Sequence, residues 1–172
     1  TFVAEITSAD EVITIEGYKY DSVVPKETLT IGTGENVINI YYTKRNDLSY
    51  TVNYLEKDTD KVLSPQKVKD GMTFGTVITS SDEVIKIDGY NYDSVDKDTL
   101  EIGTGDNVIN IYYTKRTDLS YKVNYLEKDT NKVLHDAKTV ENQTFEAVVN
   151  PADEKIAIDG YNYVGADKEK LT

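Results

Sequence analysis

Residues 47–63 read DLSYTVNYLEKDTDKVL, and residues 118–134 repeat this stretch as DLSYKVNYLEKDTNKVL, so the two copies begin 118 − 47 = 71 positions apart. Residues 31–45, IGTGENVINIYYTKR, return at the same distance of 71 as residues 102–116. A third stretch, which opens with Thr-Phe, begins at positions 1, 73 and 144. The 172-residue chain therefore holds about two and a half copies of one repeated unit.

The first part of the unit predicts a β-hairpin. Tyr50, Val52 and Tyr54 alternate with polar residues, so they share one face of a half-buried strand. Turn-forming residues follow, and residues 61–68 then read as the return strand. Pro65 has no N–H to donate, so we expect it at an edge or a bulge of that strand.

The second part of the unit predicts a short helix and two further strands. Ser80 stands three positions before Glu83, the pattern of a capping box, and we expect a helix of one or two turns that ends by Gly89. Residues 90–95 alternate like a strand. Residues 107–114 carry apolar side chains on both faces, which predicts a central, well-covered strand.

The other copies repeat this chemistry. Ser8 is followed by Glu11 at the same spacing, and Asn150 precedes a proline that suits the first helical position. Between the last two strands, Gly103 and Gly105 predict a loop with a permissive backbone. The fold class that we expect is mainly β: tandem β-grasp-like modules, each a mixed sheet with one short helix. Because no linker rich in glycine or proline separates the copies, we expect an elongated rod.

Two divisions into modules fit the repeat. In the first, residues 46–116 are a complete repeat, residues 1–45 are the C-terminal part of one, and residues 117–172 are the N-terminal part of another. The alternative starts each unit at Thr-Phe, which gives 1–72, 73–143 and a stub at 144–172. Strand pairing separates them: residues 108–113 should pack on 50–55 in the first and on 121–126 in the second.

Composition narrows the classes of function. The chain has 19 Lys and Arg against 31 Asp and Glu, a net charge of −12, so we expect no nucleic-acid partner. No apolar run approaches the roughly 20 residues of a membrane helix, so we expect no membrane insertion, and we read the chain as an internal or mature segment. With no Cys and a single His, thiolate chemistry and histidine-based metal sites are excluded. We therefore expect neither an enzyme nor a cofactor, and serial repetition favours multivalency.

The 14 tyrosines supply the candidate ligand-binding residues. Tyrosine stacks on sugar faces and brings a hydroxyl group, so Tyr42, Tyr113, Tyr90 and Tyr92 are candidates for a glycan site in each repeat. The alternative is that these rings fill a thin core and pair across strands. For the alternating tyrosines we favour the core.

Oxygen-rich loops raise a second question, that of calcium. Asp58 with Asp60 and Asp96 with Asp98 cluster in predicted turns, but neither pair matches the 12-residue calcium loop. We favour solvated turns and predict no metal site. His135 stands where the preceding copy has a serine, which indicates a variable surface position.

These residues resemble a known family. The strand from Tyr50, the Val-Leu return, Phe74, the Gly89-Tyr90 step and the closing residues 108–113 are similar to the mucin-binding-protein (MucBP) repeats of Gram-positive bacterial surface adhesins. Listerial internalin-type proteins and lactobacillal mucus-binding proteins carry similar modules. The resemblance implies a secreted, cell-wall-anchored protein whose repeats form an elongated β-grasp-related stalk, and whose partners in some members are host mucin glycans or host surface proteins.

Two functions follow as expectations. In the first, the repeats are a non-enzymatic, stiff stalk of a cell-surface adhesin that projects a binding region and contributes weak multivalent adhesion. In the second, each repeat is a carbohydrate-binding module with a Tyr-lined site. Neighbouring repeats are also partners: the incomplete C-terminal unit can accept the closing strand, residues 36–43, of another molecule.

Overall fold

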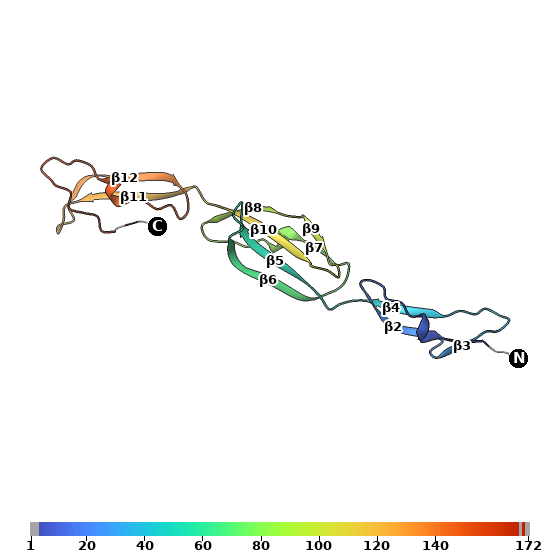
Figure 1. The fold of residues 1–172 in the computed structure, drawn as a ribbon. Helices are drawn as coiled ribbons and strands as arrows, with labels where there is room; N and C mark the ends of the chain where they lie inside the picture. Colours follow the sequence, from blue (N-terminus) through green and yellow to red (C-terminus); the bar gives the residue numbers. More distant parts are fainter. Residues whose placement is uncertain (1–3, 169, 171–172) are drawn as a thin grey trace. The chain divides into compact units, whose positions relative to one another are not determined.

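A computed structural model describes residues 4–168 and residue 170 (Figure 1). The described part of the chain is mainly β, at 49% strand and 7% helical with no helix of seven or more residues in it, which confirms the expected mainly β class. The strands named in the described part form one four-stranded sheet and four two-stranded sheets. The opening residues 1–3, which include Phe2 of the Thr-Phe stretch, lie outside the described residues.

The four-stranded sheet has the order β6-β5-β10-β8 (Figure 1). It is formed by β5 (Leu48–Glu56), β6 (Val62–Met72), β8 (Tyr90–Val95) and β10 (Val108–Lys115). Strand β5 pairs antiparallel with β6 and lies beside β10, where the Thr51 N–H donates to the carbonyl of Asn107 at 2.8 Å.

The predicted irregularity at Pro65 is confirmed. Val52 pairs with Lys67 and Tyr54 pairs with Ser64, so two residues of β6, one of them Pro65, lie opposite a single residue of β5. This is a β-bulge, and β6 is also an outer strand of its sheet. At a bulge or on the outer edge of a sheet, the residue at position 65 does not need to donate an N–H to a neighbouring strand, so proline is tolerated there.

The remaining strands form pairs that recur along the chain. The N-terminal part holds β1 (Glu5–Thr7) with β3 (Thr28–Thr30), and β2 (Tyr18–Val24) with β4 (Asn39–Lys44). The central part adds β7 (Val77–Thr79) with β9 (Thr99–Glu101). The C-terminal part is a hairpin of β11 (Leu119–Leu126) and β12 (Val133–Gln143). Single 3₁₀ turns are η1 (Ser8–Glu11), η2 (Ser80–Glu83) and η3 (Pro151–Glu154).

The core of the four-stranded sheet follows the predicted alternation. Its most buried side chains, all at most 3% exposed, are Tyr50, Val52, Tyr54, Ile102, Ile109, Ile111 and Tyr113. The expectation of two covered faces on β10 holds only in part. Alternate residues of β10 are buried, but Val108 and Tyr112 on the other face are half-buried.

The helix starts correct one prediction and confirm another. The capping box at Ser80 is wrong: Thr79 is the N-cap residue and makes no side-chain cap, while the Ser80 side chain is fully buried inside the turn. The same holds at Ser8. Asn150 is confirmed as a cap, since its Oδ1 accepts from the N–H of Ala152 at 3.2 Å.

The chain divides into two compact units. Of the described residues, one unit comprises 4–85 with 93–112, and the other comprises 86–92 with 113–168 and residue 170.

Candidate functional site

A phenylalanine contact recurs where one repeat follows another. In the first unit, Gly17 has φ +78°, and a Cβ built there would lie 2.4 Å from the ring of Phe74. The same ring meets Tyr18 edge-on, with centroids 5.8 Å apart. Position 17 requires glycine for two reasons: its φ is positive, and no side chain fits between its backbone and the ring.

Backbone hydrogen bonds fix this contact. The N–H of Phe74 donates to the carbonyl of Arg45, and the N–H of Arg45 donates to the carbonyl of Gly17, each at 2.9 Å. The Arg45 guanidinium also holds Asp47 through two bonds of 3.0 Å, which lowers the pKa of that carboxyl below its ordinary value. We call this arrangement, in which the Phe ring lies on the Gly-Tyr step, the phenylalanine latch.

The second unit contains the same latch in the next copy. A Cβ at Gly89, which has φ +81°, would lie 2.5 Å from the ring of Phe145, and that ring meets Tyr90 with centroids 5.6 Å apart. Arg116 again links the two strands of backbone, accepting from the Phe145 N–H at 2.8 Å and donating to the Gly89 carbonyl at 2.9 Å. At the third Gly-Tyr step, Gly160 has φ +78° and no described atom lies within 4 Å of its Cβ position.

A second recurring cluster ties the hairpin to the 3₁₀ turn. In the central part, Glu83 is 9% exposed, accepts a hydrogen bond of 2.8 Å from the Tyr50 hydroxyl and pairs with Lys67. Burial by itself would raise the pKa of Glu83, but the hydrogen bonds from Lys67 and Tyr50 and the charge of Lys67 outweigh it and leave the pKa below its ordinary value. The carboxylate is therefore ionised and fully engaged inside the fold.

The next copy forms the same cluster. Glu154 accepts from Lys138 at 2.6 Å and from Tyr121 at 2.8 Å, and these two bonds, the lysine's first, lower the pKa of Glu154. The Tyr125 hydroxyl donates to the Glu154 carbonyl at 3.2 Å. The N-terminal part has the equivalent carboxylate, Glu11, which is exposed.

The four tyrosines predicted to bind ligands lie in different surroundings. Tyr113 is 1% exposed and Tyr90 is 9% exposed, so neither offers a ring face to a ligand. The hydroxyl of half-buried Tyr42 donates to the carbonyl of Ile13 at 2.8 Å. Tyr92 is 47% exposed and packs edge-on against Tyr113, with centroids 6.3 Å apart. Of the four, Tyr92 presents the most open ring.

The acidic loops are turns whose shape is explained by backbone conformation and hydrogen bonds within the chain. Asp58 and Asp60 have φ +67° and +54°, the left-handed region that Asp and Asn tolerate in tight turns. Asp96 accepts from the backbone N–H of Asn110 at 3.0 Å. No group of three or more metal-ligating side chains was found among the described residues. His135 is exposed, as predicted for a variable surface position, and its ring packs on Tyr125.

Sequence reasoning missed the role of Asn107. Its Oδ1 accepts from the Gly103 N–H at 2.8 Å, and its Nδ2 donates to the Ser49 carbonyl at 2.9 Å, which joins the loop to β5. The loop glycines, Gly103 and Gly105, are not among the positive-φ residues, so the expected permissive backbone is not what shapes the loop. The signal was an Asn at the same place in both copies, at 36 and 107.

Two comparisons with known proteins, one by family and one by sequence, found no match. In the described part of the chain, no helix is long and apolar enough to cross a membrane.

Proposed function

We propose that this chain is a non-enzymatic, serially repeated spacer of a bacterial cell-surface adhesin, secreted and held at the cell wall. Its work is mechanical: it holds a binding region away from the surface and adds weak contacts through repetition. The observation that carries this proposal is the phenylalanine latch, which occurs at both junctions with the same residues. We expect a stalk to contain a recurring contact that couples each repeat to the next one, and the phenylalanine latch is such a contact.

The compact units support the same reading. The first unit contains Gly17, Arg45 and Phe74, and the second contains Gly89, Arg116 and Phe145, so each latch lies inside a compact unit. A flexible linker would place the boundary of a unit at the junction instead. We infer that adjacent repeats move little relative to each other.

The central part also supports β-grasp-like modules with the division at 46–116. Thr51 contacts Asn107, and Asn53 contacts Asn110, so β5 and β10 advance in the same direction. A sheet in which the first and last strands are parallel neighbours, flanked by antiparallel partners, is a mixed sheet of the β-grasp type. We propose this as the architecture of one repeat.

Stiffness at the junction is directly measurable. The chain has no cysteine, so spin labels at Lys26→Cys and Asp82→Cys report the distance across the first latch. We expect a narrow distance distribution for the parent chain and a broad one for Phe74→Ala, because the ring that fills the space over Gly17 is gone. Val77→Ala, at a position 59% exposed, is the control and should keep the narrow distribution. A broad distribution in the parent chain would remove the stalk proposal.

A second candidate is carbohydrate binding through exposed tyrosines. Tyr92, Tyr20 and Tyr41 are 47%, 46% and 51% exposed, which leaves ring faces open to sugars. A mucin-type glycan array probed with the full chain, beside Tyr92→Ala, tests it. Binding that the substitution removes supports a module of this class. A blank array up to about millimolar sugar leaves only the spacer.

A further inference from the structure

The first and last strands of the central sheet are neighbours. In the order β6-β5-β10-β8, strand β5 is hydrogen-bonded to β10, although four other strands separate the two along the chain. Thr51 donates its N–H to the Asn107 carbonyl at 2.8 Å, and the side chain of Asn53 donates to that of Asn110 at 2.9 Å. The partners advance in the same order on both strands, so β5 and β10 run parallel. We call the contact between these two strands the seam.

This topology fixes the direction in which tension acts on the seam. The chain enters β5 at Leu48, and the next residue, Ser49, bonds to Asn107, the residue just before β10. Because the strands are parallel, the chain then leaves β10 at the opposite end of the sheet. A pull on the chain before β5 and after β10 therefore draws the two strands past each other along their length. The hydrogen bonds of the seam are loaded in shear and must break together.

Asparagine side chains add bonds across the seam. The Nδ2 of Asn107 donates to the Ser49 carbonyl at 2.9 Å, in addition to the backbone bond that Asn107 accepts. Asn110 forms a second bridge: its Oδ1 accepts from Asn53, while its N–H and Nδ2 donate to Asp96 at 3.0 and 3.1 Å. Asp96 directly follows β8. The amide of Asn53 is thus connected through Asn110 to the end of a third strand of the sheet.

The core prevents the two strands from sliding in small steps. Val52 of β5 and Ile109 and Ile111 of β10 are all 0% exposed. A slip of one residue would turn each apolar side chain of the moving strand to the other face of the sheet. The next register that keeps them buried lies two residues away, about 7 Å along the strand. Sliding under load therefore requires the core contacts and the hydrogen bonds to be lost in one step.

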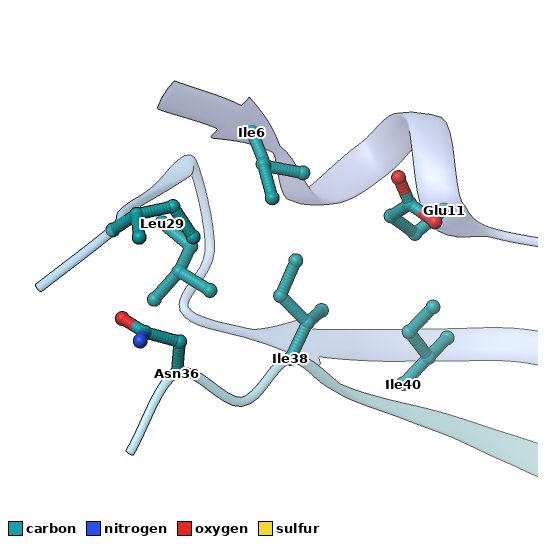
Figure 2. Close-up of a pocket in the computed structure, with 7 residues that line it drawn as sticks. Ile6, Glu11, Leu29, Asn36, Ile38 and Ile40 are labelled. Carbon is teal, nitrogen blue, oxygen red and sulfur yellow. The ribbon is translucent and has the colours of Figure 1, made fainter. Parts of the chain in front are cut away.

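The inward alternation of β10 recurs in the N-terminal part. Residues 37–44 and 108–115 both read VINIYYTK. Figure 2 shows Ile38 and Ile40, the equivalents of the two buried isoleucines of β10, projecting on the same side across a pocket toward Glu11. The alternation that fixes the register therefore belongs to the repeated sequence.

We propose that the seam is a mechanical clamp, which gives the central repeat high resistance to tension along the chain and lower resistance when the two strands are pulled apart from one end. Forced unfolding is governed by the rate of unfolding, so the contacts that break at once set the resistance. The clamp deepens the proposed stalk function and rests on it for its use, because a stalk that projects a binding region carries load along its chain.

Optical tweezers with two pairs of attachment points measure this direction dependence on the full chain. The chain has no cysteine, so exposed positions converted to cysteine carry the handles. Asn46→Cys with Thr117→Cys draws β5 and β10 past each other. Asn46→Cys with Asp106→Cys pulls both strands from one end, so the bonds of the seam break one after another. At the same loading rate, we expect the first pair to unfold the central repeat at a force at least about twofold higher. The event is identified by its gain in length, up to about 3.6 Å for each residue between the attachment points.

A single substitution separates the clamp from general stability. Asn53→Ala removes the side-chain bond to Asn110, so at constant force it should speed unfolding about fivefold in the first pair, the equivalent of one hydrogen bond. It should change the rate little in the second pair, where bonds break singly. Asn91→Ala, at an exposed position of the outer strand β8, is the matched control and should unfold like the parent in both pairs. Equal forces in the two directions, or equal acceleration by Asn53→Ala in both, would overturn the clamp.

The force measurement and the spin-label measurement fail independently. Equal forces in the two directions would remove the clamp and leave a narrow distance distribution across the first latch unaffected. A broad distance distribution would remove the stalk, while a direction-dependent force would still show the clamp in the central repeat.

Discussion

Tyr50 donates a hydrogen bond of 2.8 Å to Glu83, and Tyr121 donates one of the same length to Glu154, in both cases across 33 positions of sequence. The bond closes each module by fastening the first strand of the hairpin to the 3₁₀ turn that covers it. Lys67 and Lys138 complete the two clusters with their own pairs to the glutamates. The central and C-terminal copies thus each use one buried or half-buried carboxylate, Glu83 or Glu154, as an anchor between the hairpin and the 3₁₀ turn.

The Glu83 cluster predicts acid sensitivity. Because folding lowers the pKa of Glu83, the unfolded chain takes up this proton first on acidification. The stabilisation is complete above about pH 5 and is lost as the pH falls through the lowered pKa of the folded state. Glu83→Gln should reduce the free energy of unfolding at pH 7 by about 1–3 kcal/mol and flatten its dependence between about pH 5 and 3. Urea unfolding followed by hydrogen exchange of β5 amides measures both. The exposed Glu101→Gln is the control, and an unchanged pH profile in Glu83→Gln would contradict the assignment.

The phenylalanine latch predicts unequal costs at equivalent glycines. Gly89→Ala must displace the ring of Phe145, since the new Cβ would lie 2.5 Å from it. Gly160→Ala has the matched φ of +78° and open space, so it isolates the cost of backbone strain, about 1 kcal/mol. We expect Gly89→Ala to cost about 1–3 kcal/mol more and to shift the NMR signals of the Phe145 ring. Equal effects of the two substitutions would show that the ring contact contributes nothing.

The hairpin turn predicts a stabilising substitution. Asp58 holds φ +67°, which glycine adopts without a Cβ penalty. Asp58→Gly should raise the free energy of unfolding by about 0.5–1 kcal/mol, and Asp58→Ala should lower it by about 1 kcal/mol. Chemical denaturation of the pair gives the sign of each change. Two changes of the same sign would indicate that the Asp58 side chain, not its backbone, matters at this turn.

The loop asparagines predict a difference between copies. Asn107 is 8% exposed and bonds to Gly103 and to Ser49 on β5, so Asn107→Ala leaves buried groups unpaired and should cost about 1–3 kcal/mol. Asn36 bonds within its own loop, to Gly32 and Gly34, and is exposed, so Asn36→Ala should cost well under half of that. Hydrogen exchange at the Thr51 amide reports on the loop of Asn107, and exchange at the Ile31 amide reports on the loop of Asn36. Equal loss of protection at both would contradict the role of burial.

Local patterns predicted much of the fold. Alternation placed Tyr50, Val52 and Tyr54 on the buried face of β5, and the missing N–H of Pro65 predicted the bulge on β6. These features depend on period and backbone chemistry, which are visible in a few neighbouring residues. The mainly β class followed from them.

Contacts between residues far apart in the sequence could not be predicted from local patterns. Glu83 was interpreted as part of a capping box because Ser80 stands three residues before it. Its carboxylate instead accepts a hydrogen bond from Tyr50 and pairs with Lys67, both of which lie in the hairpin. Tyr113 was a candidate ligand site, yet it faces inward because β5 lies beside β10. Which member of a Tyr-Tyr pair points outward depends on the neighbouring strand, and the sequence of one strand does not state it.

The phenylalanine latch also bears on how such a chain changes length over generations. The phenylalanine and the glycine that it packs against both belong to the 71-residue unit. Recombination in register with the repeat therefore adds or removes whole copies, and every new junction contains both the phenylalanine and the glycine. A crossover out of step would leave a Phe without its Gly or a Gly without its Phe. Copy number is thereby free to vary in whole units, even though the spacing from glycine to ring differs by one residue between the two latches (74 − 17 = 57 and 145 − 89 = 56).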